Sequence, residues 1–269
     1  MKISNRMCTV IIILTSFALT SHASTSKPQT LTQQANTLLS QGGYPLLFVG
    51  SIAGASSEIL PCTVQNQRPV VFRIGSVLSG FASSTTLKVF YPSCGGLEPE
   101  FSARGDLLVL VICRVNGICS GLKQLMLPAT SQNMTWAQSV IKADLREKIA
   151  RFLRTHGPSH NNSVLVFEGT VRGPIPTPGM IPCKVAVNFP LLHFEVNQVL
   201  LGDWANTRVN IGFGACESIP DWLQEGQSMI VFATVNKGPA EVYGDFNLLF
   251  PSTQINEVRT ALMLHHEQH

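Results

Sequence analysis

Residues Phe194–Gly202 read FEVNQVLLG, and an earlier stretch, Phe72–Gly80, reads FRIGSVLSG. Both place Phe, a β-branched residue, Val-Leu and Gly at the same positions. In the later stretch, apolar and polar residues alternate at first, which is typical of a strand with one buried face. The alternation slips by one position before Val199, which predicts a β-bulge there. The chain therefore contains one strand pattern twice.

The repetition extends on both sides of these two stretches, in the same order and at nearly constant spacing. The further matches are Leu47–Ile52 with Val166–Val171, Pro61–Cys62 with Pro182–Cys183, Cys94 with Cys216, Gly105–Val111 with Gly226–Phe232, and Leu127–Thr130 with Phe250–Thr253. Chance would give one short similarity rather than an ordered series. We infer that the chain consists mainly of two copies of one module.

Each copy has the pattern of a small β-structure. Leu107–Val115 and Met229–Val235 are nearly continuous apolar runs, which suit strands buried on both faces. Gly50 and Gly169 interrupt strand patterns, as glycines do at sharp bends and barrel corners. About five short strands per copy, curled at such glycines, predict a closed barrel, with a two-sheet sandwich as the alternative.

Three helices are predicted between and after the strands, at Thr32–Gln41, Trp136–Thr155 and Thr253–His265. The segment around Gly157-Pro158 is rich in Gly, Pro, Ser and Asn, which is typical of a linker. The predicted division is a signal peptide at 1–23, a polar tail with a short helix at 24–43, a first module with its following helix at 44–156, a linker at 157–163, and a second module with a C-terminal helix and His-rich tail at 164–269.

The first residues predict export. Lys2 and Arg6 precede the apolar run Met7–Leu19, and Ser21-His22-Ala23 provides a cleavage site, so we expect a secreted or periplasmic protein with no membrane span after cleavage. The whole chain has 269 residues and a formal charge of +3, and removal of the leader lowers this charge because Lys2 and Arg6 go with it. That balance does not indicate a nucleic-acid partner.

The cysteines predict three disulfides. Cys8 lies in the leader, which leaves six cysteines for an exported chain. Cys62 and Cys94 of the first copy recur as Cys183 and Cys216 in the second, so each pair is expected to form a bridge inside its own module. Cys113 and Cys119 remain for each other, and a three-residue loop with Gly117 in the left-handed conformation would set them opposite one another.

The order F-x-G-x-V, F-x-V-x-x-V-L-x-G, Cys and a Gly-led apolar strand resembles the netrin-like module, the OB-type barrel of the tissue inhibitors of metalloproteinases. The second copy carries it best, in Phe167–Val171, Phe194–Gly202, Cys216 and Gly226–Val235. The resemblance implies two tandem OB-like barrels. Those inhibitors chelate the protease zinc through a mature N-terminal cysteine, whereas cleavage after Ala23 would expose Ser24. The resemblance therefore supports the barrel but not that inhibitory chemistry.

Catalytic patterns are weak in this sequence. There is no G-x-S-x-G motif, Ser159-His160 falls in the predicted linker, and six paired cysteines leave no thiolate. Asp221 and Glu225 are expected to be solvated surface residues, and His193 a local hydrogen-bonding residue. The tail histidines His265, His266 and His269 are weak candidates for a metal, and a solvated tail is the simpler interpretation.

The basic residues at 142–154 alternate with acidic ones, as on a solvated helix face. Trp204 and Trp222 occur only in the second copy and are candidate exposed ligand contacts, with edge packing over the barrel mouth as the alternative. We therefore expect an exported, non-catalytic module that binds a protein partner and needs no cofactor, with a protease-inhibitor-like role open to it. The alternatives are a glycan-binding protein that uses Trp204 and Trp222, and an enzyme whose site does not show in the sequence.

Overall fold

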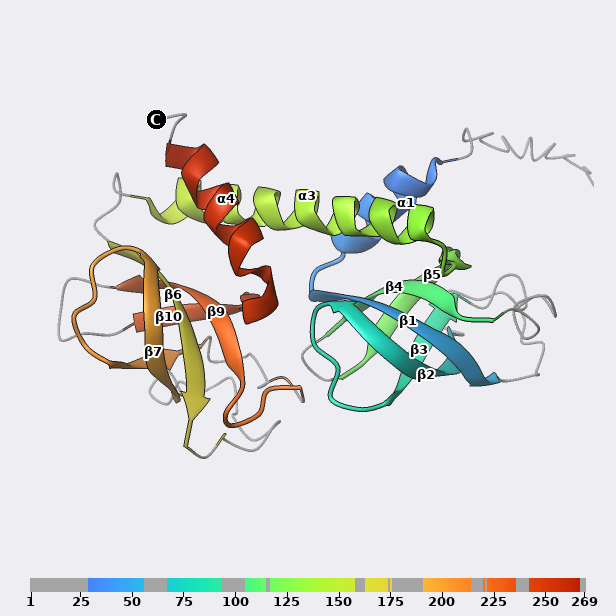
Figure 1. The fold of residues 1–269 in the computed structure, drawn as a ribbon, viewed down its shortest axis with the longest axis horizontal. Helices are drawn as coiled ribbons and strands as arrows, with labels where there is room; N and C mark the ends of the chain where they lie inside the picture. The colour runs from blue at the N-terminus through green and yellow to red at the C-terminus, as the bar shows by residue number, and fades with distance from the viewer. Residues whose placement is uncertain are drawn as a thin grey trace, which may run out of the picture.

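The structure is a computed structural model that describes residues 29–55, 67–92, 105–114, 117–157, 163–173, 175, 191–213, 220, 222–235 and 242–266. The elements in chain order are α1 (Leu31–Leu39), β1 (Tyr44–Ala55), β2 (Gln67–Ser79), β3 (Thr86–Pro92), β4 (Leu107–Cys113), β5 (Cys119–Pro128), α3 (Ser131–His156), β6 (Ser163–Arg172), β7 (Leu191–Leu201), β8 (Arg208–Gly212), β9 (Ser228–Val235), β10 (Val242–Pro251), the 3₁₀ turn η1 (Ser252–Gln254) and α4 (Ile255–His266). Figure 1 shows two separate groups of strands beneath the long helix α3.

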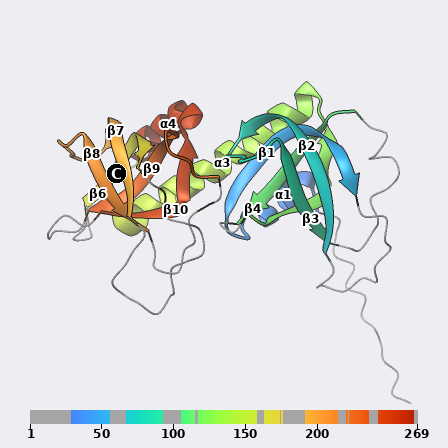
Figure 2. The same ribbon diagram turned by 90° about the horizontal axis from the view of Figure 1, so that it is seen from below.

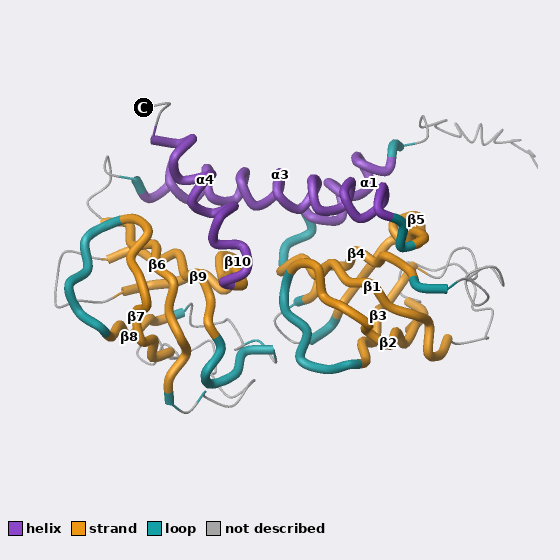
Figure 3. The backbone as a smooth tube through the Cα atoms, in the orientation of Figure 1, coloured by secondary structure: helices purple, strands orange, loops and turns teal. Residues whose placement is uncertain are grey.

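The strands form two closed five-stranded barrels of the same topology. The order is β1-β2-β3-β5-β4 in the first barrel and β6-β7-β8-β10-β9 in the second. The third and fifth strands of each barrel pair in parallel, and the other neighbours are antiparallel. The prediction of two tandem OB-like barrels is confirmed, and closure of both sheets excludes the sandwich alternative (Figure 3).

The repeated stretch is the second strand of each barrel, and it carries the predicted irregularity. On β7 the pairing with β6 skips Asn197, between Val196 and Gln198. On β2 the pairing with β1 skips Gly75 at the corresponding place. Both strands have a second shift in the pairing register a few residues further along, at Leu78 and Leu200. The bulge predicted before Val199 is therefore present, and its recurrence bends both strands alike.

The final glycine of the repeated stretch explains why that residue recurs. Gly80 and Gly202 have φ of 88° and 92°, in the left-handed region that favours glycine. A Cβ atom at Gly80 would overlap the carbonyl oxygen of Pro45, and a Cβ atom at Gly202 would overlap that of Val164. Each glycine therefore lets the end of the second strand pack closely on the start of the first strand of the same barrel.

One helix covers both barrels. The first half of α3 packs Ala137, Val140 and Ile141 on α1 and the first barrel. Its second half packs on the second barrel and α4 through a separate set of apolar residues, namely Leu145, Ile149, Phe152 and Leu153. Figure 2, from below, shows α3 running behind both strand groups. The helix that we placed with the first module therefore contacts both modules.

The shorter helices complete this helical layer. Thr30 caps α1, since its hydroxyl accepts from the Gln33 N–H at 3.2 Å and the Gln33 side chain accepts from the Thr30 N–H at 2.9 Å. Lys142 of α3 forms an ion pair with Glu257 of α4 at 3.0 Å. No helix in the described part of the chain is long and apolar enough to cross a membrane.

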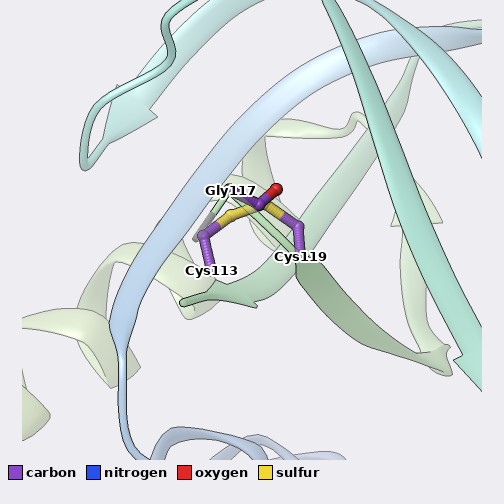
Figure 4. The surroundings of a disulfide bond; sticks show 3 residues. All are labelled: Cys113, Gly117 and Cys119. Carbon is purple, nitrogen blue, oxygen red and sulfur yellow. A yellow bond between two sulfur atoms is a disulfide. The ribbon is translucent and has the colours of Figure 1, made fainter. Parts of the chain in front are cut away.

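Cys113 and Cys119 form a disulfide between the facing ends of β4 and β5 (Figure 4). They are directly paired in the strand register, and the Arg114 N–H donates to the Ile118 carbonyl at 2.9 Å. Gly117 has a φ of 75°. This bridge and its left-handed glycine are as predicted. Cys62, Cys94, Cys183 and Cys216 lie outside the described residues, so the other two bridges stay predictions that non-reducing peptide mapping would test.

Candidate functional site

The outer face of β7 and β8 carries a compact group of polar side chains. Leu192, Phe194, Val209 and Ile211 point into the core of the second barrel and are buried. Strand alternation therefore turns the residues between them outward, and His193, Glu195, Arg208 and Asn210 are exposed. This face is formed by the second and third strands of the barrel, which is the face that OB folds use for ligands.

The strand register orders these side chains into two rows. In one row Arg172 of β6 pairs with His193 of β7, which pairs with Asn210 of β8. In the next row Glu195 pairs directly with Arg208. Side chains that are directly opposite one another on antiparallel strands lie close enough to interact. Residues from three strands therefore meet on one small surface.

Two polar contacts fix this surface. The Arg172 guanidinium donates to Glu195 Oε2 twice, from Nη2 at 2.6 Å and from Nε at 2.8 Å. His193 Nδ1 lies 2.7 Å from Asn210 Oδ1, and because that oxygen can only accept, Nδ1 carries the hydrogen. His193 is thus a local hydrogen-bonding residue, as expected from the sequence.

Trp204 bounds the same surface from the connection between β7 and β8. Its indole Nε1 donates to the Arg208 carbonyl at 3.3 Å, and its ring is half-buried against the barrel core. Among the described residues, β8 pairs with β10 at Ile211 and Gly212, which lie beyond Arg208 on the strand. The indole therefore provides a hydrogen bond to the Arg208 carbonyl, and its ring borders the polar surface on the outside of β7 and β8.

Together these residues line a groove of about 640 Å³, which we call the β7–β8 groove. Its lining consists of Arg172, Gly173, His193, Phe194, Glu195, Trp204, Arg208, Val209, Asn210 and Val242. An aromatic wall combined with a few converging polar groups is the usual composition of a ligand site.

The first barrel has the same face with different residues. By strand register Val71 stands where the second barrel has His193, Arg73 where it has Glu195, and Lys88 where it has Asn210. Thr86 replaces Arg208, and by sequence alignment of the repeats Ala82 replaces Trp204. None of the paired polar contacts of the β7–β8 groove is therefore reproduced in the described part of the first barrel.

A side chain from the second barrel packs on the end of the first, next to β3. Trp222 stacks on Phe81 with ring centroids 4.1 Å apart and planes 5° apart, and it meets Tyr44 edge-on at 5.2 Å. A cavity of only about 200 Å³ remains beside it, lined in part by Ala82, Leu87 and Lys88. Trp222 therefore covers the end of the first barrel beside β3, while the outward side chains of Val71, Arg73, Thr86 and Lys88 stay exposed.

This arrangement separates the two tryptophans that the sequence singled out. Trp222 is 3% exposed and lies between the barrels, so its ring is not available as an exposed ligand contact. The exposed contact is therefore wrong for Trp222, which packs over a barrel end instead. The sequence pattern did not indicate this, because it does not show that the two modules pack against each other. Trp204 does border a groove, as a ligand contact requires.

The other candidates from the sequence do not assemble into a site in the described residues. No three His, Cys, Asp or Glu side chains among these residues are placed to hold a metal ion. His265 lies at the end of α4, and nothing is described for the side chain of His266 or for His269. Ser159 and His160 also lie outside the described residues.

A second cleft, of about 670 Å³, lies beneath α3 and is lined by residues of α1, α3 and β10. Its charged residues pair along the helix, Lys148 with Asp144 at 3.0 Å and Arg151 with Glu147 at 2.8 Å. The pairing of Arg151 with Glu147 is exposed, as expected for a solvated helix face, whereas Lys148 and Asp144 are mostly buried, at 18% and 15% exposure. Because each cation already has a carboxylate, the cleft is a weaker candidate than the β7–β8 groove.

The sequence analysis missed most of the β7–β8 groove. Arg172, Glu195, Arg208 and Asn210 are unremarkable singly, and only the strand register brings them together. A position-by-position comparison of the two copies would have found the signal, because the polar residues and Trp204 are particular to the second copy. Neither the models of known protein families nor the curated proteins include a match to this chain.

Proposed function

We propose that the protein is an exported, non-catalytic binding protein of netrin-like architecture and that the β7–β8 groove of its second barrel receives a protein partner. The observation that carries this proposal is the different state of two equivalent faces. The face of the second barrel is a groove of about 640 Å³ with paired polar side chains and Trp204. The equivalent face of the first barrel has none of these pairs among its described residues, and Trp222 packs on Phe81 and Tyr44 at its end.

The chain contains its own example of an aromatic side chain that docks on a barrel. Trp222, from the connection between β8 and β9, packs on the end of the first barrel and leaves about 200 Å³ beside it. Large aromatic side chains are the usual anchors of protein interfaces, because they exclude much apolar surface from water. A partner loop with such an anchor would fill the second barrel in the same manner, which favours a protein as the ligand.

An inhibitor-like role fits this proposal through the groove rather than through the chain terminus. Ser24 would follow signal cleavage, and it lacks the thiol of the chelating cysteine. A protease, if it is the partner, would be bound by surface complementarity alone.

Affinity capture with paired variants tests the proposal. The mature protein, residues 24–269, is immobilised and exposed to the extracytoplasmic fraction of its own organism. We expect one partner to be retained by the wild type and by Arg73→Ala, which alters the first barrel, and to be lost with Trp204→Ala and Arg208→Ala. Equal retention by all four proteins would show that the groove is not the binding site.

A glycan is the second candidate, and the position of Trp204 is the observation that favours it. Its half-buried ring borders a groove rich in hydrogen-bonding groups, and OB barrels also bind oligosaccharides on this face. A glycan array with wild type and Trp204→Ala separates the candidates. Binding of a defined glycan that Trp204→Ala abolishes would replace the protein partner with a sugar.

A further inference from the structure

We propose that the β7–β8 groove selects an acidic peptide segment, in which a carboxylate binds Arg208 while a neighbouring aromatic side chain packs beside Trp204. This inference rests on the proposed binding function and adds the chemical class of the ligand. It follows from the unequal sharing of one carboxylate between two arginines.

Glu195 has two arginine neighbours and is bound to only one. Its Oε2 atom accepts both hydrogen bonds from Arg172, at 2.6 and 2.8 Å. Arg208 stands directly opposite Glu195 in the register, and the Val196 N–H bond to the Thr207 carbonyl at 2.8 Å makes Glu195–Arg208 a non-hydrogen-bonded pair, the closer kind. Even so, the Arg208 guanidinium forms no ion pair with any described residue. The groove therefore presents one uncompensated cation.

The remaining free groups of the groove are also mainly donors. Asn210 uses its Oδ1 atom with His193, which leaves its Nδ2 hydrogens with no described partner. Glu195 is the only carboxylate among the described residues that line the groove, and the neighbouring Glu225 Oε1 already accepts from the Gly173 N–H at 3.1 Å. Guanidinium and amide donors together match the lone pairs of a carboxylate, and charge-assisted hydrogen bonds of this kind are stronger than neutral ones.

The segment around Trp222 supplies a peptide sequence that combines an aromatic residue with carboxylates. Asp221 and Glu225 flank Trp222 in the sequence. Trp222 and Lys88 line the same small cavity of the first barrel, while Glu225 Oε1 accepts from the Gly173 N–H of the second barrel at 3.1 Å.

The experiment uses that segment as a probe. Acetylated and amidated IPDWLQEG, the sequence of residues 219–226, is titrated into ¹⁵N-labelled mature protein at physiological salt, beside IPNWLQQG, in which amides replace both carboxylates. The indole N–H signals of Trp136, Trp204 and Trp222 report on three separate places, and Trp204→Phe assigns the one of interest. We expect the Trp204 signal to move with the acidic peptide, and the amide peptide to bind about tenfold more weakly.

Three variants make the charge argument decisive. Arg208→Gln should weaken the acidic peptide about tenfold, whereas Arg73→Gln removes the same charge from the first barrel and should leave the affinity at the groove unchanged. Glu195→Gln should tighten binding of the acidic peptide severalfold, because it removes the competing carboxylate. A gain of affinity cannot result from misfolding.

Each contrary outcome has a definite meaning. Equal affinity for the two peptides, or an unchanged affinity in Arg208→Gln, refutes the acidic preference while the groove remains a binding site. Absence of any Trp204 shift at millimolar peptide refutes the inference about the ligand, whereas the capture experiment with Trp204→Ala decides the binding function separately.

Discussion

Trp222 of the second barrel lies parallel to Phe81 of the first, with ring centroids 4.1 Å apart and planes 5° apart. This contact joins the interiors of the two barrels into one apolar cluster. Gln254 of η1 adds a polar link by donating to the Ser79 hydroxyl at 2.5 Å. With α3 across both barrels, the tandem repeat is held as one body.

Truncation of Trp222 should therefore destabilise the whole protein. Replacing a buried Trp by Ala costs about 3–5 kcal/mol of unfolding free energy, and here the loss falls on the contact between the barrels. Urea unfolding should show Trp222→Ala with a much lower midpoint than Trp204→Ala, whose ring is only half-buried. Similar midpoints for the two variants would mean that the inter-barrel contact contributes little.

The glycine that ends each repeated stretch should be irreplaceable in both barrels. Gly80→Ala and Gly202→Ala introduce a left-handed alanine, at about 1–2 kcal/mol, and also an overlap with a backbone carbonyl that cannot move aside. Gly42→Ala and Gly226→Ala are matched controls, because both have positive φ but no atom within 4 Å of a new Cβ. Thermal unfolding should rank the first pair clearly below the second. Equal losses of stability in all four variants would mean that the left-handed conformation alone, and not the overlap with a carbonyl, causes the loss.

A buried hydroxyl in the first barrel should be removable without loss. Tyr91 packs over Gly121, and its buried hydroxyl has no hydrogen-bond partner among the described residues. Burial raises the pKa of the phenol well above its ordinary value. At the equivalent place in the second barrel Phe213 packs over Gly244. We expect Tyr91→Phe to be neutral or stabilising by about 1–3 kcal/mol in urea unfolding, and Phe213→Tyr to be destabilising. A loss of stability in Tyr91→Phe would reveal a partner for the hydroxyl.

The contact between α3 and α4 should depend on pH. Burial raises the pKa of the Glu257 carboxyl, but hydrogen bonds from Lys142 and its own backbone and the Lys142 charge outweigh burial, so the net pKa is lowered from 4.5. A lowered folded-state pKa means that the contribution is present above about pH 4.5 and is lost as the pH falls through the folded value.

Glu257→Gln isolates this contribution. The melting temperature of the wild type should exceed that of Glu257→Gln at pH 7 by a small margin, since half-exposed ion pairs contribute less than about 1 kcal/mol. That margin should shrink as the pH falls below about 4.5. A margin that does not change between pH 7 and pH 3 would assign the effect of the substitution to packing instead of charge.

The sequence predicted the fold because the same pattern of strands occurs in it twice. The bulge before Val199, the glycine at the end of each repeated strand and the left-handed Gly117 are local requirements, and local requirements leave a residue signature. The β7–β8 groove has no such signature, because Arg172, Glu195 and Arg208 come from three strands and meet only through the register. Trp222 was misplaced for a related reason, since strand periodicity does not specify how two modules pack together.

Site-specific photo-crosslinking tests the central claim, that the second barrel binds through its open β7–β8 face. A benzophenone amino acid is placed at Asn210 in the groove or, as the matched control, at Lys88, the equivalent exposed position of the first barrel. Each protein is expressed in its own organism and irradiated. A crosslink to one partner from position 210 and none from position 88 is the predicted result. The same partner crosslinked from position 88 alone, or equally from both positions, would contradict the account.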